Sequence, residues 1–217
     1  MTKGAQGTRP YDSRGRRAQA QANRGRILEA AQRLFVDRGF AGTSIAEIAA
    51  AAQVSTPTVF AHFGSKALLL KEAAETALVG DAQPVPLAQR PEMIHVREGR
   101  TPQEVIERFA ALVAQAGPRS VPVAMVVYRA ADANPELADV VRVLDGHRLQ
   151  GAAALAVLIL AEGDEEHLAE LRDLIWTVNA PATFDLLVHQ RGWTPQRYAR
   201  WVAEVLGSAA ERLRQDH

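Results

Sequence analysis

The feature that most constrains this chain is a pair of short helix signals separated by a tight turn. Ser44, followed three residues later by Glu47, is a capping box that predicts a helix over about 45–52. Ser55, with Pro57 in its first turn, predicts a second short helix directly after the turn. Two short helices joined in this way describe a helix-turn-helix, whose expected inward residues are Ile48, Ala49, Val54, Val59 and Phe63.

The second helix of such a unit fits the major groove of DNA, while the first crosses the backbone. Ser55, Thr56 and Thr58 carry short hydroxylated side chains that suit contacts to bases and to phosphates. The same pattern also fits an αα-hairpin within a helical bundle. What favours DNA over the hairpin is the basic flank.

The charge of the chain is unevenly distributed. Its 25 Lys+Arg cancel its 25 Asp+Glu, yet residues 1–71 hold 11 basic and 4 acidic residues, a net charge of +7. The remainder therefore carries −7. This asymmetry indicates a front end that binds a polyanion, joined to a part that does not. A solvated basic face without a partner is the alternative.

Composition excludes several other classes of protein. The chain has no cysteine, so disulfides, thiol nucleophiles and thiolate metal sites are excluded. The longest strictly apolar run, 152–161, is ten residues, about half of what a membrane span needs. No apolar stretch follows the basic residues near the N-terminus, so no secretory signal is predicted. We expect a cytoplasmic protein with no membrane partner.

No pattern points to catalysis, a cofactor or a metal. The six histidines form no pair at metal-ligand spacing, and Asp185 with His189 is expected to be a surface pair. Nucleophile elbows, phosphate-binding glycine loops and zinc-protease helices are not found. We therefore expect no enzymatic activity.

The rest of the chain predicts an all-α fold. Residues 1–22 lack large apolar side chains and are predicted to be a disordered basic arm, which either contacts DNA or is a non-contacting tail. A helix should end at Gly39. Residues 81–101 are expected to form a long loop or linker. Beyond it, about six helices are expected after residue 65, with starts at Thr101-Pro102, Asn134-Pro135 and Thr194-Pro195, a break at Gly117-Pro118 and a new cap at Ser120.

The last two helices present more apolar surface than one core requires. In the last helix a broad stripe includes Tyr198, Trp201 and Val205. The helix expected over about 168–190 is apolar on more than one side. One face can pack in the chain's own core and the other against a second subunit. Burial in a large monomeric core is the alternative.

The amino-acid sequence of residues 24–71 is more similar to one known family than the helix-turn-helix pattern alone requires. The segment resembles the DNA-binding domain of the TetR (tetracycline repressor) family through Ile27, Ala30, Phe35, Gly39, Thr43, Ile48, Ala49, Val54, Ser55, Thr58, His62, Phe63, Lys66 and Leu69. The resemblance implies a homodimeric transcriptional regulator, usually a repressor, with a three-helix DNA-binding domain at 23–66. A helical domain at 67–217 would bind a small molecule and dimerise through its last two long helices.

The resemblance also implies site residues. Ser44 and Lys66 would contact phosphates, Thr56, Pro57 and Thr58 would approach bases, and His62 would lie near the DNA backbone. The full expected DNA-binding set is Thr43, Ser44, Ser55, Thr56, Pro57, Thr58, Phe60, His62 and Lys66. Two positions depart from the family pattern, because Gln53 stands where glycine is usual in the turn and Phe60 where tyrosine is usual.

Candidate effector residues are the larger or polar groups in the middle helices: Phe109, Met125, Tyr128, Arg129, His147, Trp176, Asn179 and Phe184. Each alone fits ordinary core packing, but together they indicate a mainly apolar pocket with few polar anchors. Arg129, if it points inward, would favour an anionic ligand. The expected dimer contacts are Leu171, Ile175, Val178, Trp201 and Val205.

The sequence thus predicts a ligand-responsive regulator, a repressor that a small molecule releases from a palindromic double-stranded operator. The alternative is a helical DNA-binding protein without a small-molecule effector, with an architectural role or regulated by a protein partner.

Overall fold

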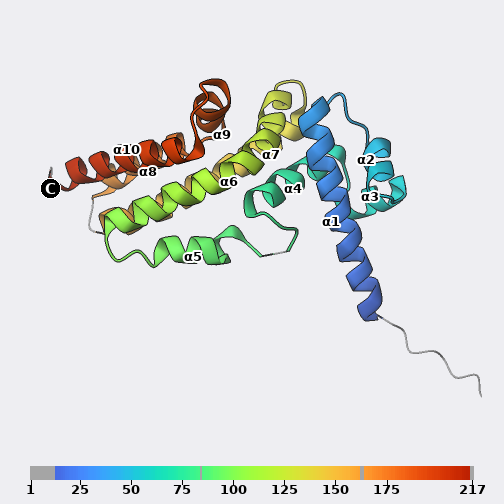
Figure 1. The fold of residues 1–217 in the computed structure, drawn as a ribbon, viewed down its shortest axis with the longest axis horizontal. Coiled ribbons are helices and arrows are strands. Elements are labelled where there is room, and N and C mark those ends of the chain that lie inside the picture. Colours follow the sequence, from blue (N-terminus) through green and yellow to red (C-terminus); the bar gives the residue numbers. More distant parts are fainter. Residues whose placement is uncertain (1–12, 84, 162–163, 216–217) are drawn as a thin grey trace, which may run out of the picture.

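The computed structural model describes residues 13–83, 85–161 and 164–215, and within them every regular element is a helix (Figure 1). The all-α prediction is confirmed. The elements are α1 (Ser13–Arg38), α2 (Ile45–Ala51), α3 (Thr56–Phe63), α4 (Lys66–Val79), a 3₁₀ turn (Leu87–Gln89), α5 (Pro91–Arg97), α6 (Pro102–Ala131), α7 (Pro135–Leu160), α8 (Glu165–Val178), α9 (Pro181–Phe184), a π-helical turn (Asp185–Gln190) and α10 (Pro195–Gln215).

We call residues 13–79, which hold α1–α4, the head, and the described residues from 85 to 215 the body. Figure 1 shows α2 and α3 at one end of an elongated molecule and the C-terminal end of α10 at the other. The long helices α6 and α7 run between them, so they are the elements that join the two ends of the fold.

The core of the head is closed by the body. Ile27, Phe35 and Ile48 are fully buried there, together with the inner face of α4. The same apolar cluster includes Val123, Val126 and Val127 of α6 and Leu137 and Val140 of α7. The core therefore continues past the predicted boundary at residue 66. A shift of α6 or α7 would directly change the packing of the head core.

A second apolar cluster fills the body. It gathers buried residues of α5, α6, α7, α8 and α10, with Leu171, Tyr198 and Val202 fully buried among them. Tyr198 packs edge-on against Phe184, with ring centroids 4.9 Å apart. The apolar stripe predicted for the last helix is thus used largely inside the protomer.

The predicted break at Gly117-Pro118 is wrong, because α6 continues through Pro118 and Pro122. Gly117 serves packing instead, since a Cβ there would lie 2.2 Å from the Phe184 ring. Ser120 is not a cap, and its hydroxyl donates to the Ala116 carbonyl 2.9 Å away within the same helix. At this position the glycine is explained by its contact with Phe184 and does not mark a helix end.

Three other boundaries differ from the predictions. Residues 13–22 belong to α1, in which the alanines and glutamines at 18–22 are exposed but favour a helix. Residues 1–12 of the predicted arm lie outside the described residues. The expected loop at 81–101 contains α5. The expected helix at 168–190 ends at Val178, and Pro181 starts α9.

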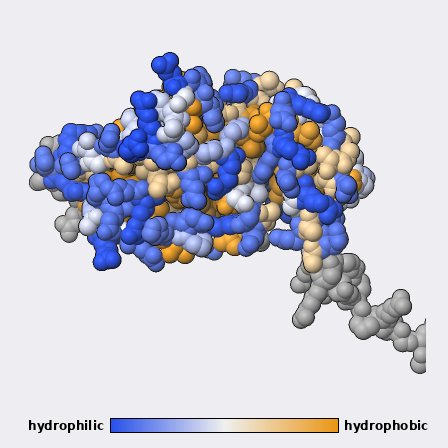
Figure 2. Space-filling model, viewed as in Figure 1, coloured by the Kyte–Doolittle hydropathy of each residue, from blue (hydrophilic) through white to orange (hydrophobic). Residues whose placement is uncertain are grey.

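Two helices, α6 and α7, are long and apolar enough to cross a membrane by length and composition alone. The core helices of soluble proteins pass the same test. Here α6 packs against α4, α7 and α10, and Figure 2 shows hydrophilic residues over most of the visible face of the body. We therefore assign both helices to the core of the fold.

Candidate DNA-binding site

The helix-turn-helix forms as the caps predict. The Ser44 hydroxyl accepts from the Glu47 amide at 3.2 Å, and the Glu47 carboxylate accepts from the Ser44 amide at 2.9 Å. Ser55 caps α3 through the Thr58 amide at 3.3 Å. In the turn, Gln53 has a φ of 55°, the left-handed conformation that glycine tolerates best. The turn is retained at a strain of roughly 1 kcal/mol.

The outward face of α3 is short-chained except for one aromatic ring. Val59 and Phe63 anchor the helix inward, while Thr56 and Thr58 are half-buried. Pro57 is exposed, and Phe60 is 48% exposed. An exposed phenyl ring on this face can contact a thymine methyl group but cannot donate a hydrogen bond. This face offers both hydroxyl and apolar contacts to DNA.

Ser44 lies exposed at the N-terminus of α2, where free amides and the helix dipole favour a phosphate. Its hydroxyl already donates to Glu47 at 2.7 Å, and Arg38 pairs with the same carboxylate at 2.7 Å. These donors lower the pKa of Glu47, with the hydrogen bonds from Ser44 as the largest cause. The cap is thus a charged network on the side of α2 that would cross the DNA backbone.

Thr43 does not fit its predicted DNA-binding role. Its side chain is 2% exposed, and its hydroxyl bonds to the carbonyls of Leu34 and Gly39 at 3.0 and 2.9 Å. The hydroxyl satisfies the C-terminal carbonyls of α1 and so fixes the loop that leads into α2. A threonine in a binding motif can be there for the fold alone.

Lys66 is also held by the protein. Its ammonium donates to the carbonyls of Phe40 and Thr43 at 2.8 and 3.0 Å and lies 4.1 Å from the centroid of the Phe40 ring. Burial lowers the pKa of this ammonium. At most one of its three protons is left for a phosphate, so its main structural role is to tie α4 to the α1–α2 loop.

Two further cationic side chains of α1 face the protein, and His62 is half-buried. Arg24 pairs with Glu72 of α4 and lies 5.6 Å from the centroid of the Phe63 ring. Arg26 donates to the Ala52 carbonyl at 3.1 Å. His62 stands beside Phe63, with ring centroids 6.0 Å apart.

The predicted effector residues differ in burial and do not share one environment. Arg129 is 66% exposed and pairs with Asp185 at 3.3 Å, so it does not point inward. His147 is exposed, whereas Phe109 and Phe184 are core residues. Met125, Tyr128, Trp176 and Asn179 are half-buried. Asp185, expected on the surface, is buried, and it is bonded to His189 at 3.0 Å.

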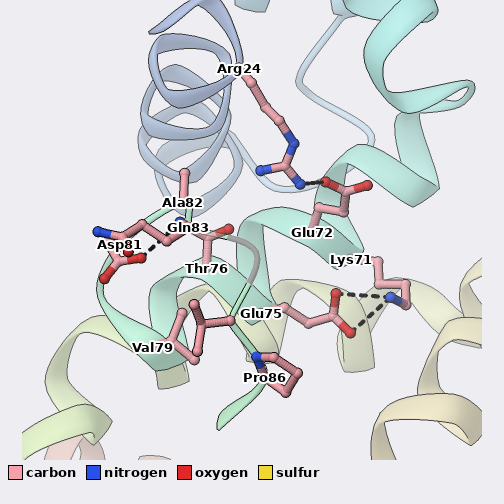
Figure 3. A pocket seen from close by; sticks show the side chains of 11 residues that line it. Arg24, Lys71, Glu72, Glu75, Thr76, Val79, Asp81, Ala82, Gln83 and Pro86 are labelled. Carbon is pink, nitrogen blue, oxygen red and sulfur yellow. Dashed lines mark hydrogen bonds and ion pairs between the residues drawn. The ribbon is translucent and has the colours of Figure 1, made fainter. Parts of the chain in front are cut away.

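Two surface pockets have other linings. One of about 360 Å³ lies between α1, α4 and the chain that follows α4, where Glu72 pairs with Arg24 and Lys71 with Glu75 (Figure 3). The other, about 500 Å³, is an open groove between α6 and α10 floored by small residues such as Ala110 and Ala203. Neither includes a predicted effector residue.

The structure corrects three of the expected dimer contacts. Leu171, Ile175 and Val178 of α8 are at most 2% exposed within one protomer, so they cannot contact a second copy directly. Trp201 and Val205 of α10 are half-buried and remain available. Exposed apolar residues of the body that sequence reasoning overlooked include Leu186 in the π-helical turn, 50% exposed, and Val157 of α7, 54% exposed.

The comparisons with known proteins agree with the geometry of the head. The family described as bacterial regulatory proteins, tetR family, matches residues 27–73. Over 53 residues the chain is 45% identical to the HTH-type transcriptional activator FasR of Mycolicibacterium smegmatis and 43% identical to the HTH-type transcriptional regulator TtgR of Pseudomonas putida. The aligned segment is 24% of this chain and spans about a quarter of the length of each relative.

Solved structures match the whole fold at low identity. A transcriptional regulator of Pseudomonas aeruginosa PAO1 is similar over 94% of this chain and 99% of its own, with a TM-score of 0.68 and 16% identity. A TetR-family regulator of Mesorhizobium loti covers 89% and 97%, with a TM-score of 0.64 and 16% identity. A regulator of Saccharomonospora viridis, solved with choline, covers 85% and 95% at a TM-score of 0.59 and 21% identity.

The matched residues 27–73 are those that build the helix-turn-helix, and the likeness at low identity extends the fold through α10. Over residues 27–73, this chain therefore matches the tetR family of bacterial regulatory proteins, and this matched segment carries the helix-turn-helix.

Proposed function

We propose that this protein is a cytoplasmic, homodimeric transcriptional repressor that binds a near-palindromic DNA operator and releases it when a small effector binds the body. The observation that carries the proposal is the outward face of α3, where Thr56, Thr58 and the exposed Phe60 stand on a fully capped helix-turn-helix.

The charge distribution supports head-first docking. The +7 of residues 1–71 attracts the DNA backbone, and the −7 of the remainder is repelled by it. Two heads on one duplex require a dimer, and Trp201, Val205 and Leu186 give the body apolar surface for a second copy.

Release by an effector follows from the shared core. DNA and effector would select different positions of the two heads, so each ligand weakens the binding of the other. The route is the packing of α6 and α7 into the head core. The choline found in the Saccharomonospora viridis structure supports a ligand site in a related body, although that ligand belongs to that protein.

The test is selection of binding sequences from a random duplex library with the full chain, followed by affinity measurements on the selected and a scrambled duplex. We expect an inverted repeat that binds at least 10³-fold more tightly than the scrambled duplex. Thr58→Ala should weaken the selected duplex more than the scrambled one, since Thr58 is assigned to base contact. Equal affinity for both duplexes would contradict the proposal.

The effector-free alternative has one observation in its favour, because neither surface pocket is lined by the predicted effector residues. A metabolite panel distinguishes the two functions. A compound that raises the melting temperature and releases the selected duplex supports the repressor with an effector. Stabilisation by a protein partner alone supports the alternative.

A further inference from the structure

Four side chains from three helices meet in the body and form a polar cluster, which consists of Tyr128 of α6, Asp145 and Arg148 of α7, and Trp176 of α8. Tyr128 donates to Asp145 Oδ1 at 2.5 Å, and Arg148 Nη1 donates to the same oxygen at 2.6 Å. Arg148 Nη2 donates to the Trp176 carbonyl oxygen at 2.6 Å. The guanidinium carbon lies 5.0 Å from the centroid of the Trp176 ring. These contacts fix both side chains in place.

Two donors of the cluster have no partner. Arg148 Nε and Trp176 Nε1 are both buried and make no hydrogen bond. Leaving a buried donor unsatisfied costs about 1–3 kcal/mol, so native structures contain few of them and each one needs an explanation. Here two belong to side chains in contact with each other. Both unmatched atoms are donors, so the missing group is a hydrogen-bond acceptor.

The charges in the cluster limit which kind of acceptor group can bind there. Asp145 offsets the charge of Arg148. Burial, reinforced by the bond to Asp145, raises the pKa of Tyr128 to about 12, so Tyr128 stays a neutral donor. A neutral carbonyl or a carboxylate oxygen can meet the free N–H groups. A tetraalkylammonium head group offers these N–H groups no acceptor.

We propose that Arg148 Nε and Trp176 Nε1 hold the oxygen of the effector, which is a small molecule with a mainly apolar body and a carbonyl or carboxylate group. This inference rests on the proposed function, in which an effector binds the body. The apolar part follows from Trp176 itself, which packs against the apolar cluster of the body. Neither of the two surface pockets described above is lined by Arg148 or Trp176.

The cluster lies where it can act on the head. Tyr128 directly follows Val127, which is fully buried in the head core. Asp145 directly follows Leu144, which packs against the same core. An occupant that moves Tyr128 or Asp145 therefore changes the packing beneath the DNA-binding helices, which gives the coupling a contiguous physical route.

The test uses three eight-carbon probes with the full chain: octanoate, 2-octanone, and octyltrimethylammonium. Melting temperature and calorimetric affinity are measured for the wild type, for Trp176→Phe, which removes one free N–H, and for Trp193→Phe. Trp193 is a matched control, because it is also half-buried beneath an arginine, with the Arg197 guanidinium 4.0 Å from its ring centroid. Arg148→Lys is the second test variant, since it keeps the charge and removes Nε.

At least one acceptor probe should stabilise the wild type, and the ammonium should not. Trp176→Phe should weaken the acceptor probe about tenfold, as expected for the loss of one hydrogen bond of about 1.4 kcal/mol. Arg148→Lys should weaken it at least as much, because it also removes the Nη bonds to Asp145 and to the Trp176 carbonyl. Trp193→Phe should bind as the wild type does. Equal binding by all variants, preference for the ammonium, or no binding by either acceptor probe would overturn the inference.

Stability without any ligand gives an independent readout. Both tryptophan substitutions remove the same volume, but only Trp176→Phe also removes an unsatisfied donor. Trp176→Phe should therefore lower the melting temperature less than Trp193→Phe does. The reverse order would show that water already satisfies the cluster and would overturn the inference. Affinity of the wild type for the selected duplex is measured in parallel. If the wild type does not recognise the operator, the proposed function fails, whatever the probes show about the polar cluster.

Discussion

The head and the body are both helical, but different interactions define their helices. In the head, Ser44, Ser55 and Ser65 each cap a helix start within three residues of chain. In the body, α6 continues through two prolines because its neighbours hold it, and Gly117 is small because Phe184 needs the space. Local caps also set helix starts in the body, at Thr101, Asn134 and Asp164, but which residues of the body helices are buried, and where α6 continues, depends on contacts distant in sequence. The difference explains why the head could be recognised from sequence and the body could not.

The largest expected effect concerns the contact between two bodies. Trp201→Asp places a charge on the half-buried face of α10 and should convert the dimer into monomers. Two linked heads bind a duplex more tightly than one by about 10²-fold or more, so operator affinity should fall by that factor. Light scattering and anisotropy titration measure the two effects. Gln196→Asp, exposed on the same helix, should leave both unchanged, and a dimeric Trp201→Asp variant would remove α10 from the interface.

Gly117→Ala tests whether packing or helix propensity has the larger effect on stability at this position of α6. Propensity alone predicts stabilisation of about 1 kcal/mol. The added Cβ would lie 2.2 Å from the Phe184 ring, and such overpacking costs about 1–3 kcal/mol. We expect the melting temperature to fall by several degrees. As a control, Gly151→Ala on α7 meets no atom within 4 Å and should raise it, and a rise for both variants would contradict the packing role of Gly117.

Lys66→Met tests whether that lysine serves the fold of the head or the DNA. The substitution keeps the aliphatic chain beside Phe40 and leaves two carbonyls without their donor, so stability should fall by about 1–3 kcal/mol. The slope of log affinity against log salt should stay unchanged, whereas loss of a phosphate contact would reduce it by roughly one unit. Lys71→Met, whose ammonium pairs with Glu75 on its own helix, is the control for stability.

Acid should loosen the head through its capping box. The pKa of Glu47 is lowered below 4.5 by its hydrogen bonds to Ser44 and by Arg38. The stabilisation is therefore fully present above pH 4.5 and is lost as the pH falls through the lower folded value. Melting curves between pH 7 and 3 should show a smaller decline for Glu47→Gln than for the wild type. An identical decline would mean that other carboxylates dominate acid unfolding.

The smallest expected effect is at the exposed ring of Phe60. If this ring contacts a thymine methyl group, replacing that thymine by uracil in the selected duplex should weaken binding about fourfold, from about 0.8 kcal/mol per buried methyl-sized group. Phe60→Ala should abolish the difference between the two duplexes. If the difference persists in Phe60→Ala, another side chain reads the methyl group.

Much of the head was predictable, and the reasons are local. Both partners of the capping box, Ser44 and Glu47, lie within four residues of sequence. The start of α2 can therefore be predicted without information about the rest of the chain. Two residues predicted to contact DNA, Thr43 and Lys66, instead donate hydrogen bonds to carbonyls of the α1–α2 loop. Their hydrogen-bonding groups suit either role, and only the fold shows which partner is in reach.

Less of the body was predictable, because burial there depends on where helices cross. Leu171, Ile175 and Val178 form an apolar face that fits an interface or a core equally well, and the structure buries it in the core. The polar cluster was only half recognised. Tyr128 and Trp176 were candidates for the effector site, whereas Asp145 and Arg148 have the spacing of an ordinary surface ion pair. No sequence signal distinguishes that pair from a buried one.

In the proposed function, binding of a ligand by the body changes the affinity of the head for the operator. The most direct measurement is an anisotropy titration of the selected duplex with the wild-type protein, with and without the acceptor probe that stabilises it. We expect tight binding to the selected duplex and weak binding to the scrambled one. Operator affinity should fall at least fivefold when the probe saturates the body, which is the lower end of usual coupling energies. Operator affinity that is the same with the body empty and saturated would contradict the proposed function.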